Sequence, residues 1–128
     1  MTTRGMPAPD QPSKLVDLGE ALAADTRIAW ISLTDNPGGN PMIPADWLGN
    51  VLKPSGKELV IHLTCKDLNR NGLESAAWRY AAEGFDNILA LTGDFPVAGF
   101  RGAAQPVFDL DSVSLIEMMR DMNAGLTV

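Results

Sequence analysis

The sequence predicts an α/β fold, a partial TIM (β/α)8 barrel with three parallel strands and flanking helices. Short apolar segments alternate with amphipathic segments along the chain, and the apolar segments recur at a nearly constant interval. These apolar segments are Ile28–Leu33, Leu59–Leu63 and Ile88–Leu91. Each ends in a Leu that Thr follows, 30 residues apart from Leu33 to Leu63 and 28 apart from Leu63 to Leu91. That interval is about the length of one strand–helix unit, and the segments are too short and too rich in branched aliphatic residues to be helices.

Segments with apolar residues at helical spacing predict four helices. In the first of them, Leu15, Leu18 and Leu22 form one stripe. Ser13 is placed to cap its N-terminus. The predicted helices are Ser13–Ala24, Ala45–Leu52, Asn71–Glu83 with Gly84 as a left-handed residue beyond it, and a last one from a cap at Asp111 to Asn123. Because strands and helices alternate strictly, the strands should be parallel and joined by right-handed crossovers.

The residues of the predicted strands separate into two faces. Odd positions are branched aliphatics, and even positions are small or polar: the odd set is Ile31, Leu33, Ile61, Leu63, Leu89 and Leu91, and the even set is Ser32, Thr34, His62, Thr64, Ala90 and Thr92. Side chains alternate along a strand, so we expect the odd set beneath the helices. A small, polar opposite face is typical of a barrel interior near a ligand.

The length of the chain bounds its organisation. Residues 1–12 are polar and Pro-rich and are expected to be irregular, and residues 13–128 should form one partial-barrel domain. A complete barrel takes about 250 residues. Three strands leave two open edges and one uncovered face, so we expect a longer product, a partner chain or a homo-oligomer to complete the barrel.

Composition excludes several classes of partner. The net charge of −6 argues against a nucleic-acid partner, which needs a basic face. No apolar run is long enough to span a membrane, and the N-terminal segment lacks the apolar core of a secretory signal. The single cysteine, Cys65, excludes an internal disulfide. We expect a cytoplasmic protein.

A ligand site is expected beyond the C-terminal ends of the strands, as in other parallel β/α folds. Three polar segments follow the predicted strands: Thr34–Asn40, Thr64–Asp67 and Thr92–Asp94. Helix capping could explain Asp35 and Asp67 equally well. Asp94 lies between Gly93 and Phe95, where no helix begins, so a functional role is favoured for it.

Other residues with functional chemistry give weaker signals. His62 and Cys65 are three apart on a strand and should point to opposite faces, so we expect no metal site. Trp30, Trp47 and Trp78 are expected to pack between helices and sheet.

The strand-end segments resemble, in order, those of the methylenetetrahydrofolate reductase family. The matching segments are Thr34–Pro41, His62–Asp67 with Asn69 and Arg70, Asn87–Asp94, and Pro106–Ser112. The resemblance covers about Ser13 to Leu126. It implies a flavin-containing (β/α)8 barrel that reduces FAD with NAD(P)H and passes hydride to the folate substrate 5,10-methylenetetrahydrofolate, giving 5-methyltetrahydrofolate.

The resemblance also implies which residues bind the flavin. Thr34 matches a threonine beside the flavin, and His62 matches a histidine that contacts it. Thr92 and Gly93 match the loop against the isoalloxazine ring, although the family often has Arg at the position of Thr92. Phe108 falls where the family tends to have an aromatic residue near the flavin.

Asp94 is the implied catalytic residue and also belongs to the flavin-binding loop. The matching acid lies near the pyrimidine edge of the flavin and the folate pterin. A negative charge there opposes the anionic reduced flavin and so tunes hydride transfer.

One departure from the family leaves the function open between three classes. The family carries a glutamate general acid on its first strand, and no Glu precedes Glu20 here, so we expect that strand and the C-terminal half of the barrel to be missing and the chain alone to be inactive. The alternatives to a partial reductase are a non-catalytic accessory subunit of a folate complex and a folate-binding methyltransferase-type barrel, which needs no flavin.

Overall fold

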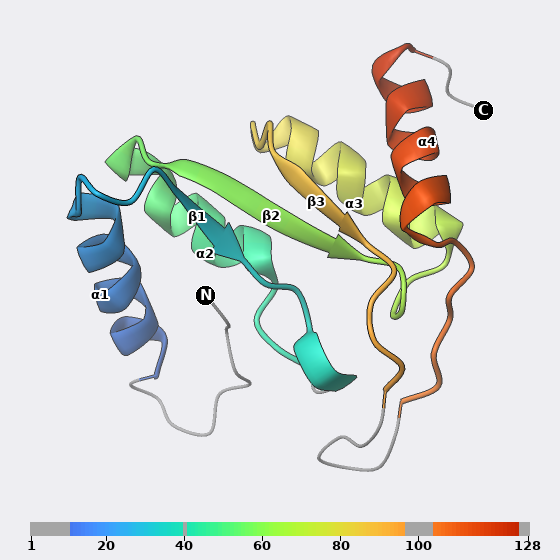
Figure 1. The fold of residues 1–128 in the computed structure, drawn as a ribbon, viewed down its shortest axis with the longest axis horizontal. Helices are drawn as coiled ribbons and strands as arrows, with labels where there is room; N and C mark the ends of the chain where they lie inside the picture. The colour runs from blue at the N-terminus through green and yellow to red at the C-terminus, as the bar shows by residue number, and fades with distance from the viewer. Residues whose placement is uncertain (1–10, 40, 97–103, 126–128) are drawn as a thin grey trace.

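The computed structural model describes residues 11–39, 41–96 and 104–125, which form one three-stranded sheet with four α-helices. In chain order the elements are α1 (Gln11–Ala24), β1 (Trp30–Leu33), η1 (Pro37–Gly39), α2 (Ala45–Leu52), η2 (Lys53–Ser55), β2 (Glu58–Thr64), α3 (Arg70–Ala82), β3 (Ile88–Leu91) and α4 (Ser112–Asn123) (Figure 1). The strands lie in the order β1-β2-β3, and both pairings are parallel. The predicted parallel sheet in sequence order is therefore confirmed. Among the described residues, no helix is long and apolar enough to cross a membrane.

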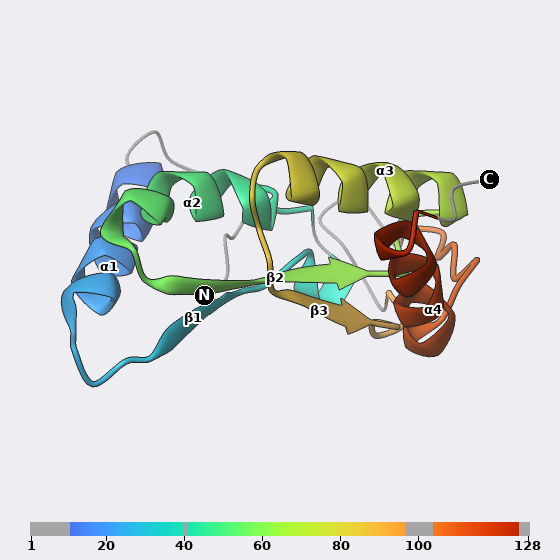
Figure 2. The same cartoon turned by 90° about the horizontal axis from the view of Figure 1, so that it is seen from above.

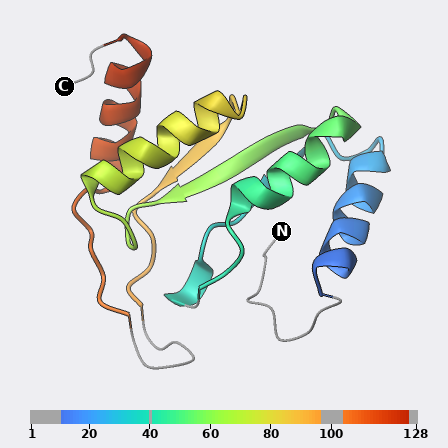
Figure 3. The same cartoon turned by 180° about the vertical axis from the view of Figure 1, so that it is seen from behind.

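Three of the four described α-helices lie on one side of the sheet (Figure 2). Figure 2 shows α1, α2 and α3 above the strands, and Figure 3 shows α2 and α3 lying across the same face from behind. α4 packs against β3 and beside α3. No helix of the described residues covers the other side, which we call the open face. Its residues are Trp30, Ser32, Val60, His62, Leu89 and Leu91.

The faces of β1 and β2 agree with the sequence prediction, and the face of β3 does not. Leu33 pairs with Ile61, and Ile61 pairs with Ile88, so these three side chains point toward the helices. Leu89 pairs with His62 and therefore lies on the open face. The predicted placement of Ala90 on the open face and of Leu89 and Leu91 beneath the helices was wrong.

The physical reason is a one-residue offset in the pairing of β3. The recurring Leu-Thr dipeptides suggested a step of 28 residues, whereas Ile61 and Ile88 are 27 apart. A shift of one residue moves every side chain of a strand to the opposite face. Because β3 reads Ile-Leu-Ala-Leu, apolar at every position, its own sequence could not choose between the two faces.

The core lies between the sheet and the helices. Its most buried members are Leu33, Leu48, Leu52, Ile61, Leu63, Leu73 and Leu115. The tryptophans are not part of it. Trp30, Trp47 and Trp78 are 57%, 39% and 48% exposed, so their predicted role in helix–sheet packing was wrong.

The helix ends follow local side-chain chemistry. Asp111 caps α4 as predicted, since its carboxylate accepts a hydrogen bond from the Ser114 N–H at 2.8 Å. Asn69 caps α3 in the same way, and Gly84 follows α3 with a φ of 72°. Ser13 is not a cap, because α1 begins at Gln11. The segment predicted to be irregular covers residues 1–12. Residues 11 and 12 belong to α1, and residues 1–10 lie outside the described residues, as does Asn40.

Candidate functional site

The three parallel strands bring their C-terminal ends to one edge of the sheet, where the arrowheads lie in Figure 1. Thr34 follows β1, Thr64 ends β2 and Thr92 follows β3. Sequence reasoning placed the site at this edge because ligands of parallel β/α folds bind beyond the carboxyl ends of strands.

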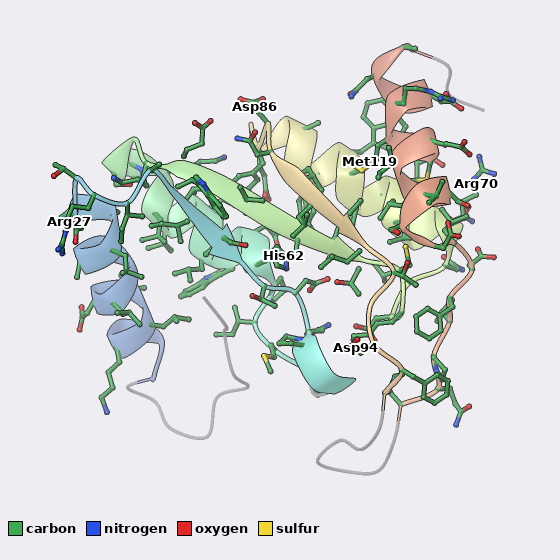
Figure 4. The ribbon with its side chains drawn as sticks, viewed as in Figure 1. Arg27, His62, Arg70, Asp86, Asp94 and Met119 are labelled. Carbon is green, nitrogen blue, oxygen red and sulfur yellow. The ribbon has the colours of Figure 1, made fainter. Side chains whose placement is uncertain are left out.

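His62 lies on the open face, two residues before the end of β2 (Figure 4). Its Nε2 is 2.6 Å from the Ser32 hydroxyl of β1. Its Nδ1 is enclosed and has no hydrogen-bond partner among the described residues. Burial lowers the pKa of His62 below its usual value, so the imidazole is neutral at pH 7. The site therefore contains a neutral imidazole with one nitrogen fixed by a neighbour and the other without a partner among the described residues.

Thr92 and Gly93 follow β3 and connect it to the end of β2 and the start of α4. Gly93 has a φ of 88°, and a Cβ at this position would lie 2.4 Å from the Thr64 methyl and 3.2 Å from the Lys66 side chain. Only glycine fits this close approach without displacing the end of β2. The Thr92 hydroxyl accepts a hydrogen bond from the Ser112 N–H at 2.9 Å, so it holds the start of α4 against the end of β3.

Asp94 follows on the same segment and is exposed (Figure 4). Within the described ranges, no hydrogen bond or ion pair holds its carboxylate. A turn residue that satisfies backbone N–H groups would show such bonds. Asp94 therefore presents a negative charge at the strand ends without a structural partner in the described part of the chain.

Phe108 precedes α4 in the chain, and its side chain contacts the segment that follows β3. Its ring stacks on Phe95, with the ring centroids 6.3 Å apart and the planes inclined by 24°. The backbone of Phe108 has a φ of 43°, which is uncommon for a bulky residue. The neighbouring Val107 N–H donates to the Lys66 carbonyl at 2.8 Å, which ties this segment to the end of β2. Sequence reasoning singled out Phe108 but missed Phe95, whose exposure gives no periodic signal.

Asp35 and Asp67, for which the sequence left helix capping and function equally open, form a charged cluster with Lys66 just below the strand ends. Sequence reasoning missed the burial of Lys66. The Lys66 side chain is only 3% exposed, and its ammonium forms an ion pair with the Asp67 carboxylate. Burial raises the pKa of Asp35 to about 6, and the nearby negative charge of Asp67 adds to the rise. The ammonium of Lys66 opposes it, and the carboxylate of Asp46 adds a further, smaller rise. The Asp35 carboxylate thus lies close to that of Asp46, which belongs to the first turn of α2.

Replacing Asp35 with Asn should stabilise the chain above pH 6 by roughly 1–2 kcal/mol, since a rise of about two pKa units corresponds to at most about 2.7 kcal/mol. The folded pKa lies above the unfolded value, so the folded chain binds more protons between about pH 4 and pH 6. The wild type should therefore lose stability as the pH rises through this window, and the variant should not. Urea unfolding at a series of pH values measures this difference. Asp17→Asn, at an exposed position of α1, is the matched control and should keep the loss of stability that Asp35 causes in this window.

Two hollows in the described part of the chain lie away from the strand ends. One, of about 270 Å³, is at the N-terminal end of the sheet and is lined by Lys53, Lys57 and Asp86 among others. The other, of about 330 Å³, lies between α3 and α4 and is lined by Met119 and Met122. Neither is where a parallel β/α fold binds its ligand. The candidate site is instead the open face and the loops at its C-terminal edge.

The fold and the site define a β/α protein with a neutral imidazole, an exposed carboxylate and an aromatic pair at the carboxyl ends of parallel strands. The chain belongs to the methylenetetrahydrofolate reductase family, since the model of that family, described as methylenetetrahydrofolate reductase, matches residues 8–127. The resemblance seen in the strand-end motifs is thereby confirmed. No curated protein and no solved structure matches the chain.

Proposed function

We propose that this chain serves in the reduction of 5,10-methylenetetrahydrofolate to 5-methyltetrahydrofolate by NAD(P)H, with FAD bound across the C-terminal ends of its strands. On this proposal the three strands are a segment of a (β/α)8 barrel, and the open face is its interior. The observation that carries the proposal is the Nδ1 of His62 on that face, which has no partner among the described residues. By the resemblance of the strand-end motifs, His62 corresponds to the flavin-contacting histidine of the family. Thr34, Thr92, Gly93 and Phe108 complete the proposed flavin site.

The residues at this edge fit a flavin. The ring system of a flavin has an acceptor-rich edge and a large apolar surface. His62 supplies a polar nitrogen that lacks a partner among the described residues, and Leu89 lies beside it in the sheet with 42% of its surface exposed. The offset of β3 strengthens this fit, because it places leucines rather than Ala90 on the open face.

A bound FAD would supply the hydride chemistry, and the residues of the chain would set its position and charge. His62 would hold the acceptor edge of the ring. Asp94 would place a negative charge near it and offer a polar partner to the folate pterin. The carboxylate is free to do both, since no described residue neutralises it. We propose Asp94 as the catalytic residue on this basis.

Titration of the purified chain with FAD, followed by the absorbance and fluorescence of the flavin, tests the proposal. Binding with a defined stoichiometry supports it. Binding of tetrahydrofolate without FAD would favour the methyltransferase-type barrel. Binding of neither FAD nor tetrahydrofolate would overturn the proposal and would favour a non-catalytic accessory subunit.

Asp94→Asn, made in a chain completed to the full barrel, tests the role of the carboxylate. The FAD affinity should stay within about twofold, because most contacts of the cofactor lie elsewhere. The reduction potential of the bound flavin should rise, since a charge opposing the anionic reduced form is removed. Turnover of the folate should fall by roughly tenfold or more, for the loss of one buried polar contact of about 1–3 kcal/mol. Asp86→Asn, an exposed acid at the other end of the sheet, is the control. An unchanged potential with unchanged turnover would leave Asp94 without this role.

A further inference from the structure

Within the described part of the chain, one hydrogen bond holds the imidazole of His62, and it crosses the sheet to Ser32. Ser32 of β1 pairs in register with Val60, and the His62 side chain reaches the Ser32 hydroxyl diagonally. The distance of 2.6 Å between Ser32 Oγ and His62 Nε2 is short for a bond of this kind. Both side chains are half-buried on the open face. The Ser32 hydroxyl thus fixes the orientation of the His62 ring on the open face.

The direction of this hydrogen bond follows from the chemistry of the two groups. A neutral imidazole has one protonated nitrogen and one with a lone pair, and the partner of one nitrogen fixes the state of the other. The ring nitrogen is basic, with an aqueous pKa near 6.5. It is therefore a stronger acceptor than the oxygen of a hydroxyl group. The favoured arrangement has the Ser32 hydroxyl donating to Nε2, which leaves the proton of the ring on Nδ1.

A proton on Nδ1 makes this nitrogen a hydrogen-bond donor with nothing to donate to among the described residues. Buried donors without an acceptor are rare in folded proteins, and each one calls for an explanation. An acceptor atom of a ligand on the open face would satisfy it. The lowered pKa of His62 supports this account, because a neutral ring is the only state in which the tautomer is at issue.

We propose that Ser32 is the positioning residue of the site: its hydroxyl holds His62 as the Nδ1–H tautomer, and Nδ1–H is the donor that the open face offers to an acceptor atom of its ligand. The inference rests on the proposed function in naming FAD as that ligand. Without Ser32, the ring would be free to populate the other tautomer and present a lone pair instead. The bound acceptor edge would then meet a second acceptor, which is repulsive.

His62 is the only histidine of the chain, so nitrogen NMR of the histidine-labelled protein reports on this one ring without assignment. In the wild type at pH 7.5, Nδ1 should show the shift of a protonated ring nitrogen and Nε2 that of a bare one. Ser32→Ala should move both signals toward the average of a mixed population. Ser32→Thr keeps the hydroxyl on a residue that suits a strand, and it should restore the wild-type pattern. Ser75→Ala, exposed on α3, is the control for labelling and folding.

A protonated Nε2 in the wild type, or identical spectra for the wild type and Ser32→Ala, would overturn the inference. A merely structural role of Ser32 would change the stability of the chain without moving the two nitrogen signals in opposite directions.

FAD then tests the ligand half of the inference. Adding FAD should shift the Nδ1–H resonance of the wild type, and Ser32→Ala should bind FAD roughly fivefold to tenfold more weakly while Ser32→Thr binds it as the wild type does. FAD that binds without moving the Nδ1–H resonance would overturn this half. If no variant binds FAD, the proposed function fails, and the spectra without FAD still decide whether Ser32 sets the tautomer.

Discussion

Gly93→Ala should lower the free energy of unfolding by about 3 kcal/mol. Part of this loss is backbone strain, because an L residue in the left-handed region costs roughly 1–2 kcal/mol. The remainder is steric, since the new Cβ would lie 2.4 Å from the methyl of Thr64, whose side chain is almost fully buried. Overpacking of this kind typically costs about 1–3 kcal/mol. Urea unfolding with an unchanged dependence on denaturant measures the total.

Gly56→Ala separates the two contributions. Gly56 has a similar φ of 69°, but nothing lies within 4 Å of the position where its Cβ would be. This control should lose only the backbone part. In the Thr64→Ser background, which lacks the clashing methyl, Gly93→Ala should cost little more than the control does. Equal losses for Gly93→Ala and Gly56→Ala in the wild-type background would show that the contact with Thr64 is absent.

Asp67→Ala should destabilise the chain by about 3 kcal/mol, because it leaves the buried ammonium of Lys66 without its ion-pair partner. Lys66→Met, in contrast, should change stability by less than about 1 kcal/mol. Methionine keeps the apolar stem that packs under Gly93 and removes the charge that needs a partner. Thermal or urea unfolding of the two variants checks the asymmetry.

Asp121→Ala is the matched control for the loss of an ion pair. The pair of Arg120 and Asp121 is exposed, and such pairs contribute about 0–1 kcal/mol. A loss of less than 1 kcal/mol for Asp67→Ala would contradict the prediction and would mean that Asp35 takes over as the counter-charge of Lys66. In that case the double variant of Asp35→Asn and Asp67→Ala should show the full loss.

Hydrophobic periodicity was enough to predict the elements of this fold. The limits of α2 and β3 agree with the sequence, and α3 differs by one residue at each end, because apolar spacing and end residues such as Asp111 and Gly84 act locally. The register of β3 could not be predicted from the sequence, because a strand that is apolar at every position has no alternation to mark its buried face. Its pairing with β2 depends on tertiary contacts, among them the packing of α4 against β3.

The candidate site was predictable only in part. The position of His62 followed from the alternation along β2, but its bond to Ser32 depends on the stagger between β1 and β2. Lys66 looks like any surface lysine in the sequence. It is buried because Gly93 and Val107, both distant in the chain, pack over the end of β2. Contacts of this kind arise from tertiary structure and leave no local pattern.

The sheet has two outer strands, and each pairs on one side only within the described part of the chain. The free edges of β1 and β3 therefore expose backbone N–H and C=O groups that an extended segment of another chain can pair with. The exposed Leu89 on the open face would add an apolar contact that stabilises such an association. The net charge of −6 opposes it, because copies of the chain repel one another at low ionic strength. The colloidal behaviour of the chain thus depends on a balance between short-range backbone pairing and long-range repulsion, and added salt shifts that balance toward self-association.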